Sequence, residues 1–156
     1  MRFSNEMIPK AEFKPYRKKI VKAIKIIVGP RTANWVGDQL LYSNEPRLRM
    51  RLTELANHAG SAFAELIGDA GTWASVITMA RNRLTHHDEY QPFEREHGDL
   101  LFLADSVYVL VMLCIFKECD VPDEALINIR GNGRIRFTRD KLQEIIPRLS
   151  RFTRRV

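Results

Sequence analysis

The sequence predicts an all-α fold, an up-and-down bundle of four to six helices in a single domain over residues 1–156. Apolar residues recur at intervals of three and four along most of the chain, which is the pattern of amphipathic helices. The periodic stretches are joined by short segments rich in Gly, Pro and Asn, as in antiparallel helical bundles. A hydrophobic fraction of 45% with 28% charged residues is typical of a globular domain and argues against disorder.

Three helices are expected in the first part of the chain. The first begins near Pro15, because proline suits the first turn of a helix, and it ends at Gly29-Pro30. A shorter helix covers about residues 33–42 and is closed by a turn-forming sequence. The third runs from about residue 47 to residue 67, since its apolar residues keep helical spacing throughout.

A fourth helix follows a turn over residues 68–71. Thr72 is a suitable N-cap for it, and the helix is expected to run from Trp73 to about His86. The polar and acidic stretch over residues 88–98 is expected to be a loop, because it contains a proline and lacks apolar periodicity.

The longest apolar stretch, Leu100–Phe116, is expected to lie within a helix over about residues 99–118, the central helix of the bundle, buried nearly all round. Its length approaches that of a membrane span, but Asp105 falls inside it, and a charge in hydrocarbon is costly. A last amphipathic helix is expected over residues 139–149, preceded by a hint of a short strand over residues 133–137.

Charge is distributed unevenly along the chain, with two basic ends around an acidic centre. Lys and Arg outnumber Asp and Glu by 12 to 5 in residues 1–55 and by 9 to 2 in residues 130–156. Basic ends can attract a polyanion and contact its phosphates, so nucleic acid is an admissible partner. Cys114 and Cys119 have no partners at metal-ligand spacing, which argues against a zinc site and favours the reducing cytoplasm. No metal or cofactor is expected.

The residues that carry chemistry lie near the end of the fourth helix. At about 100° per residue, Asn82 and His86 lie about 40° apart on the helix surface. The Asn82 amide can hydrogen-bond the imidazole and fix its orientation, and a histidine can exchange protons near neutral pH. Arg81 provides a permanently charged fork suited to a phosphate. Arg81, Asn82 and His86 are therefore the predicted catalytic residues.

A single copy of this site only partly encloses a phosphate, because Arg81 and His86 diverge by about 140° on one helix. Two copies facing each other across a two-fold axis would surround it, which predicts a shared site in a homodimer. His87 is the alternative proton carrier, although it lies toward the side expected to face the core, formed by Trp73, Ile77, Ala80 and Leu84.

The pattern Arg81-Asn82-x-x-x-His86 resembles the motif of HEPN domains, specifically of the ApeA-like branch found in prokaryotic defence proteins. The similarity extends over most of the chain, from about residue 10 to residue 129. It includes three flanking segments: Arg51–Leu55, Val76–Ala80 and Asp120–Pro122.

The resemblance implies a helical bundle that dimerises to form a metal-independent endoribonuclease, acting in phage defence or toxin-like growth arrest. In such enzymes the ribose 2′-OH attacks the adjacent phosphodiester and leaves a 2′,3′-cyclic phosphate. Carried onto this sequence, Arg81 would bind the phosphate, His86 would handle protons and Asn82 would position them. ApeA-like domains usually lie at the C-terminal end of longer proteins. The resemblance thus implies RNA and a second copy of the chain as partners, together with further domains of a parent protein or an antitoxin. No membrane partner is expected.

The alternative function is a catalytically inactive helical module that binds nucleotide, RNA or a partner protein. For either function, Arg134, Arg136 and Arg139 are candidate contacts for an RNA backbone. The large aromatic side chains at helical spacing are expected to pack in the core rather than to form a base-stacking surface: Trp35, Phe63, Trp73, Phe102 and Tyr108.

Overall fold

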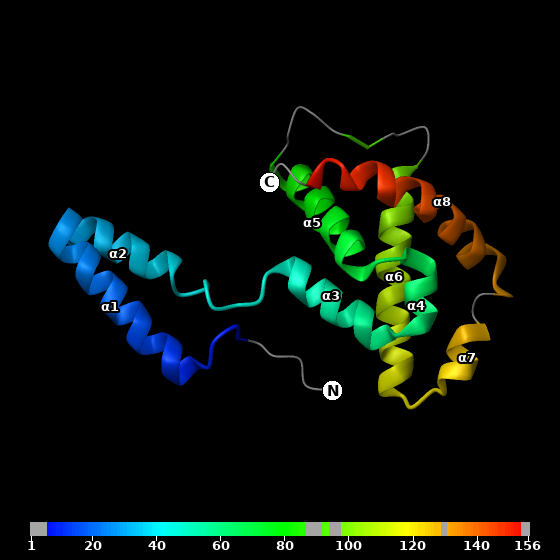
Figure 1. The fold of residues 1–156 in the computed structure, drawn as a ribbon, viewed down its shortest axis with the longest axis horizontal. Helices are drawn as coiled ribbons and strands as arrows, with labels where there is room; N and C mark the ends of the chain where they lie inside the picture. The colour runs from blue at the N-terminus through cyan, green and yellow to red at the C-terminus, as the bar shows by residue number, and fades with distance from the viewer. Residues whose placement is uncertain (1–5, 87–91, 94–97, 129–130, 154–156) are drawn as a thin grey trace. The chain divides into compact units, whose positions relative to one another are not determined.

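The computed structural model describes residues 6–86, 92–93, 98–128 and 131–153, and of His86 only the backbone. Within these residues the chain forms eight helices and no strand, which confirms the predicted all-α class (Figure 1). The helices form two compact units, an N-terminal unit, Met1–Arg47, and a C-terminal unit, Leu48–Val156. Apolar periodicity continues on both sides of this division, so periodicity alone cannot reveal it.

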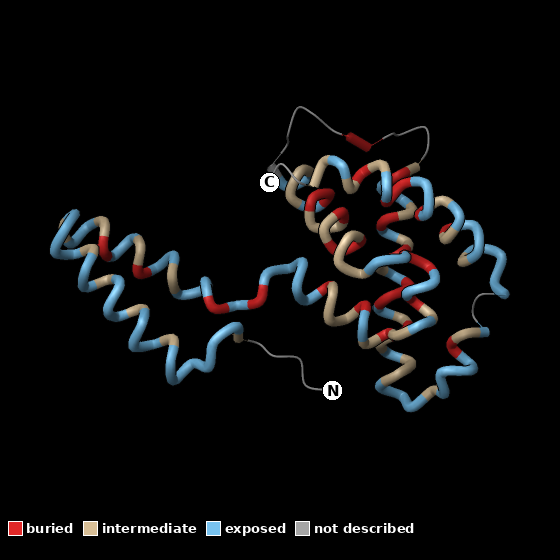
Figure 2. The backbone as a smooth tube through the Cα atoms, viewed as in Figure 1, coloured by how far each residue is buried: buried red, intermediate tan, exposed pale blue. Residues whose placement is uncertain are grey.

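The N-terminal unit is a hairpin of α1 (Lys10–Val28) and α2 (Pro30–Gln39). The helices join at Gly29, whose φ of 99° lies in the region that favours glycine. Gly37 allows them to approach closely, since a Cβ at this position would lie 3.4 Å from Val21 Cγ2. α1 contributes no fully buried residue, and most of the hairpin is exposed (Figure 2).

α1 begins at Lys10, earlier than the expected start near Pro15. The Glu6 carboxylate accepts a hydrogen bond from the Lys10 backbone N–H at 2.8 Å, which satisfies a free donor at the helix start. Pro15 consequently lies inside the helix. The two ends of the hairpin are joined by Asn44, whose side chain donates to Ile8 O at 2.7 Å and accepts from Ile8 N at 2.9 Å.

The C-terminal unit is a helical bundle in which α3 and α8 both pack against α5 and α6, and α4 packs against α3, α6 and α8 (Figure 1). Its helices are α3 (Leu48–Ala59), α4 (Ser61–Ile67), α5 (Ala70–His86), α6 (Asp99–Glu118), α7 (Asp123–Asn128) and α8 (Gly133–Ser150).

Two expected elements of the bundle differ from the structure. The single helix expected over residues 47–67 is divided into α3 and α4 at Gly60, whose φ of 75° breaks the helical path. The strand hinted at over residues 133–137 is wrong, since this segment is the first turn of α8. Asn132 caps that helix by accepting a hydrogen bond from Arg134 N at 2.9 Å. α8 therefore begins six residues earlier than expected.

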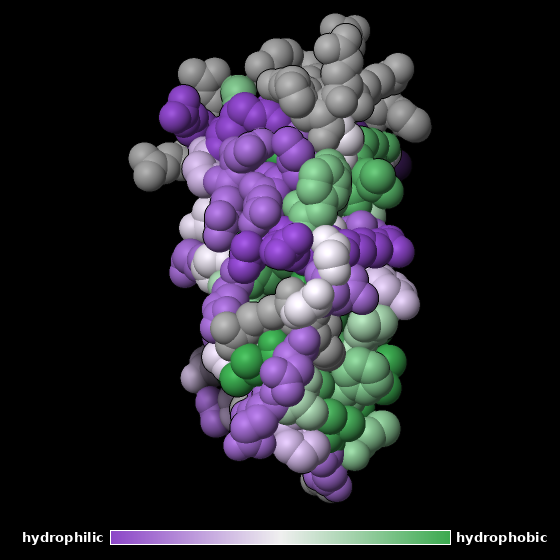
Figure 3. Space-filling view, turned by 90° about the vertical axis from the view of Figure 1, so that its right-hand side faces the viewer, coloured by the Kyte–Doolittle hydropathy of each residue, from purple (hydrophilic) through white to green (hydrophobic). Residues whose placement is uncertain are grey.

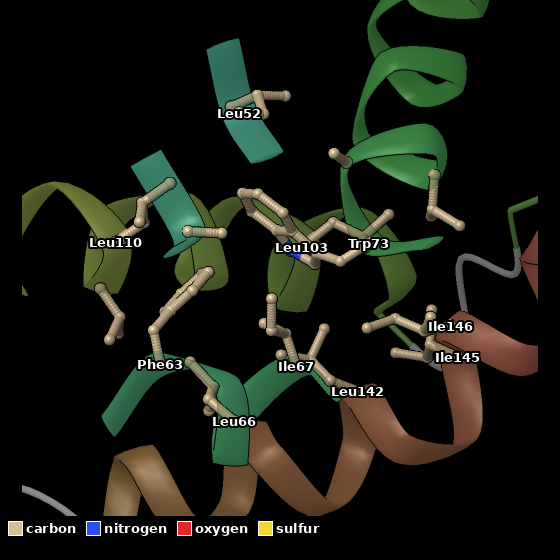
Figure 4. Packing of buried hydrophobic residues seen from close by; sticks show 14 of the residues in the cluster. Leu52, Phe63, Leu66, Ile67, Trp73, Leu103, Leu110, Leu142, Ile145 and Ile146 are labelled. Atoms are coloured by element: carbon tan, nitrogen blue, oxygen red, sulfur yellow. The ribbon is translucent and has the colours of Figure 1, made fainter. Parts of the chain in front are cut away.

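The core of the bundle is built around Trp73 and Phe63, which are fully buried as expected (Figure 4). Their rings pack edge to face with centroids 5.1 Å apart. Trp73 Nε1 donates to Ser106 Oγ at 2.9 Å, and Ser106 Oγ donates to Leu103 O at 2.6 Å. These bonds satisfy the buried Trp73 N–H and the Ser106 hydroxyl, and they connect α5 to α6.

α6 has the expected bounds, and within the described residues it is the one helix long and apolar enough to span a membrane, judged by length and composition alone. It packs against α3, α4, α7 and α8. The expectation that it is buried nearly all round is wrong, because these neighbours leave one face uncovered. Tyr108, expected in the core, lies on that face and is 59% exposed. Figure 3 shows apolar side chains gathered along one edge of the molecule.

Candidate functional site

The candidate site lies on α5, whose start is fixed by Asp69. Asp69 Oδ1 accepts hydrogen bonds from the hydroxyl and the backbone N–H of Thr72, both at 2.7 Å. These bonds favour the charged carboxylate and hold the pKa of Asp69 below its ordinary value of 3.8. Asp69 therefore caps the helix in place of Thr72, and α5 begins three residues earlier than expected.

The buried side of α5 orients the helix within the bundle. Trp73, Val76 and Met79 are buried, and Ala80 continues this side. Leu84, which the helical wheel places on the core side, is instead 51% exposed. The core covers α5 only as far as Ala80, so the last turns of the helix stand at the surface of the bundle.

Arg81 and Asn82 are brought together at the point where the core ends. The Arg81 side chain is exposed, and its Nη1 donates to Asn82 Oδ1 at 3.1 Å. A guanidinium has five N–H donors, so this bond leaves donors for an anion. The Thr85 hydroxyl donates to Arg81 O at 2.7 Å, within the same stretch of helix. The arrangement presents a fixed positive charge and an amide at the surface.

His86 is the last residue of α5, one helical turn beyond Asn82 on a continuous helical backbone. The His86 side chain and the whole of His87 lie outside the described residues. The expected hydrogen bond between Asn82 and the imidazole, and the choice between the two histidines, therefore stay predictions. Asn82 Oδ1 has two lone pairs, so the bond from Arg81 leaves it one for a second donor.

The three arginines proposed as RNA contacts all lie on α8, and two of them face a carboxylate. Arg134 Nη2 lies 2.7 Å from Asp105 Oδ1, and this hydrogen-bonded ion pair raises the pKa of Arg134. Arg139 Nη2 lies 2.8 Å from Asp140 Oδ1, while Arg136 is exposed. Their contact with RNA stays a prediction, and a phosphate would have to compete with these carboxylates at two of the three positions.

An ion pair that the sequence pattern did not indicate anchors the chain beyond α5. Arg148 Nη2, on α8, lies 2.7 Å and 2.6 Å from the two carboxylate oxygens of Asp99, which is 1% exposed at the start of α6. Arg148 Nη1 also donates to Pro92 O at 3.4 Å. This cluster connects Pro92 and the start of α6 to α8.

Among the residues that the structure describes, no three His, Cys, Asp or Glu side chains lie together as potential metal ligands. The chemistry available from the described part of the site is anion binding by Arg81 and hydrogen bonding by Asn82. The predicted proton carrier is the histidine at the end of the helix, and this role stays a prediction.

Comparison with known proteins bears on this site. The family model described as Apea-like HEPN matches residues 2–125, which include all of α5 and the three predicted catalytic residues. No curated protein and no solved structure matches the chain.

Proposed function

The chain belongs to the Apea-like HEPN family, and on that premise we propose that it is a metal-independent endoribonuclease. Family membership by itself indicates a nuclease-like or defence-associated role. The finer proposal is supported chiefly by the exposed Arg81, hydrogen-bonded to Asn82 one turn before His86. The biological role that we propose is phage defence or toxin-like growth arrest in the cytoplasm.

In the proposed reaction the ribose 2′-oxygen attacks the adjacent phosphorus, so that the O2′–P bond forms and the P–O5′ bond breaks. His86 takes the proton from the 2′-OH, and Arg81 stabilises the negative charge that develops on the phosphoryl oxygens. The second lone pair of Asn82 Oδ1 accepts the imidazole N–H, which leaves the other ring nitrogen to act as base. The products are a 2′,3′-cyclic phosphate and a 5′-hydroxyl.

A second copy completes this site in our proposal. It supplies the proton that the leaving O5′ requires, from its own His86, and a second cation on the opposite side of the phosphate. Leu84 supports the proposal, because its exposed side chain follows Arg81 by three residues on the same helix. It offers the second copy an apolar contact beside the site.

The test is cleavage of a labelled mixed-sequence RNA in EDTA by the wild type and by two variants, Arg81→Ala and His86→Ala. Each variant is expected to lose about 10²- to 10⁴-fold in rate, the usual contribution of a general acid or base or of one charge-stabilising group. The matched control is His87→Ala, which is expected to cleave at the wild-type rate.

Loss of activity in His87→Ala with full activity in His86→Ala would reassign the proton carrier to His87. RNA binding by the wild type without cleavage at any protein concentration would contradict the nuclease proposal and favour the inactive binding module. Cleavage at the same rate by all four proteins would identify a contaminating nuclease.

A further inference from the structure

Five of the seven cations of α1 line one groove of the N-terminal unit. The groove lies between α1 and α2 and has a volume of about 660 Å³. Its lining includes five cations and a single carboxylate, Asp38, with Val21 and Gly37 on the facing sides of the two helices. The five cations all come from α1: Lys14, Arg17, Lys18, Lys22 and Lys25.

The spacing of these cations follows from helical geometry. Lys14, Lys18, Lys22 and Lys25 recur at intervals of four, four and three, so they form one row that rises about 16 Å along the helix. Arg17 is held at the groove because its Nε donates to Gly37 O at 3.2 Å. A row of positive charge along a groove is the arrangement that follows a phosphate backbone, and an isolated anion would occupy only part of it.

A second observation in the same unit points to nucleic acid. Trp35, expected in the core, is 63% exposed, because α1 and α2 bury only the side chains that face each other. Trp35 is not itself among the groove residues, but it lies about one helical turn before Asp38, which lines the groove. Proteins that bind single strands without strong sequence preference combine a basic groove for the backbone with exposed aromatic rings on which bases stack.

We propose that the α1–α2 groove is a docking site for the backbone of single-stranded RNA, with Trp35 as a stacking surface for its bases. The inference deepens the proposed function, on which it rests for RNA as the substrate, by assigning substrate binding to residues outside the cleavage motif. In this proposal the cations of α1, rather than the arginines of α8, make the main contacts with the RNA backbone.

An anionic lipid surface is a less suitable partner for this groove. Three of the five exposed large apolar residues of α1, Tyr16, Ile20 and Ile27, lie roughly 180° around the helix from the row of lysines. A membrane that buried this apolar stripe would leave the groove on the opposite side, facing water. The groove and its cations therefore fit a ligand that is charged along its length.

The test measures binding of a short labelled single-stranded RNA to the full chain by fluorescence anisotropy in EDTA, at several salt concentrations. The chain carries His86→Ala so that cleavage does not change the probe. The test variant is Lys18→Gln/Lys22→Gln. The matched control is Lys19→Gln, since Lys19 is an exposed lysine of the same helix that is not among the groove residues.

The double variant is expected to lower the slope of log affinity against log salt by about 1.4, about 0.7 for each lost phosphate contact. If the two proteins bind RNA equally well at 1 M salt, this change in slope makes the affinity of the double variant about 25-fold weaker at about 0.1 M salt. Lys19→Gln should leave affinity and slope unchanged. Trp35→Ala should weaken binding about fivefold or more without changing the slope, because stacking carries no charge.

Wild-type affinity and slope in the double variant would overturn the proposal, as would a slope change of about 0.7 in Lys19→Gln, which is the effect expected of one groove contact. Binding of the chain to vesicles of anionic phospholipid but not to RNA would overturn it in favour of a membrane. Cleavage by wild type is measured on the same RNA. RNA binding that depends on the groove lysines, without cleavage by the wild type, would support the docking site and contradict the proposed nuclease function. Cleavage by the wild type, with unchanged RNA binding in the double variant, would support the nuclease function and overturn the docking site.

Discussion

Replacing Arg148 by methionine is expected to destabilise the C-terminal unit, because it removes the guanidinium that pairs with the buried Asp99 carboxylate. The Asp99 side chain is fully buried, and both of its oxygens lie within 2.7 Å of Arg148 Nη2. Methionine keeps much of the apolar length of arginine but can neither donate a hydrogen bond nor neutralise the carboxylate.

The magnitude follows from the burial of the two partners. Removing one member of a buried ion pair costs about 3–5 kcal/mol, because the other charge stays in a poorly solvating environment. The lower end applies here, since the Arg148 side chain is 32% exposed and water can reach the vacated position. The long bond to Pro92 O adds less than about 1 kcal/mol. We expect a loss of about 3 kcal/mol in the free energy of unfolding.

Urea unfolding followed by circular dichroism measures this loss, with Arg151→Met as the control because Arg151 is exposed on the turn that follows α8. The control should change stability by less than about 0.5 kcal/mol. The double variant Asp99→Asn/Arg148→Met should recover most of the loss, since no buried charge remains. A loss below about 1 kcal/mol in Arg148→Met, or no recovery in the double variant, would refute the reasoning.

Three further substitutions test other parts of the structure. Gly60→Ala should cost about 1–2 kcal/mol in thermal unfolding, because alanine does not readily adopt a φ of 75°; an unchanged melting temperature would contradict this. Asp69→Ala should cost about 1 kcal/mol at neutral pH through loss of the cap. Because the pKa of Asp69 is lowered by folding, its contribution is present above pH 3.8 and disappears as the pH falls through the lowered folded pKa, so the two proteins should converge in acid. Leu84→Asp should weaken self-association and RNA cleavage together, whereas Leu101→Asp, on the exposed face of α6, should do neither; unchanged self-association in Leu84→Asp would exclude Leu84 from the dimer contact.

Local signals predicted most of the helices but not how they are terminated. α6 has its expected bounds because its long apolar run is bounded on both sides by polar segments, which mark where the helix begins and ends. Gly60 divides α3 from α4 because its backbone is left-handed, and an isolated glycine within an apolar periodic stretch does not reveal its φ. α8 and α5 begin earlier than expected because Asn132 and Asp69 cap them, and the sequence offers several nearby residues that could equally serve as caps.

The candidate site shows the same division between local and long-range information. Arg81 and Asn82 are adjacent in sequence, so their proximity on one helix could be predicted. Leu84 and Trp35 could not be assigned correctly, because their exposure depends on which side of each helix the neighbouring helices cover, and how far along it. Arg148 and Asp99 are far apart in the sequence, and no local pattern connects them.

The central claim is best tested by identifying the ends of RNA fragments after incubation of the wild-type protein with labelled RNA in EDTA. The account predicts 2′,3′-cyclic phosphate and 5′-hydroxyl ends, and no cleavage at a nucleotide whose 2′-OH is replaced by hydrogen. Fragments with 3′-hydroxyl and 5′-phosphate ends, or cleavage at the 2′-deoxy position, would contradict it.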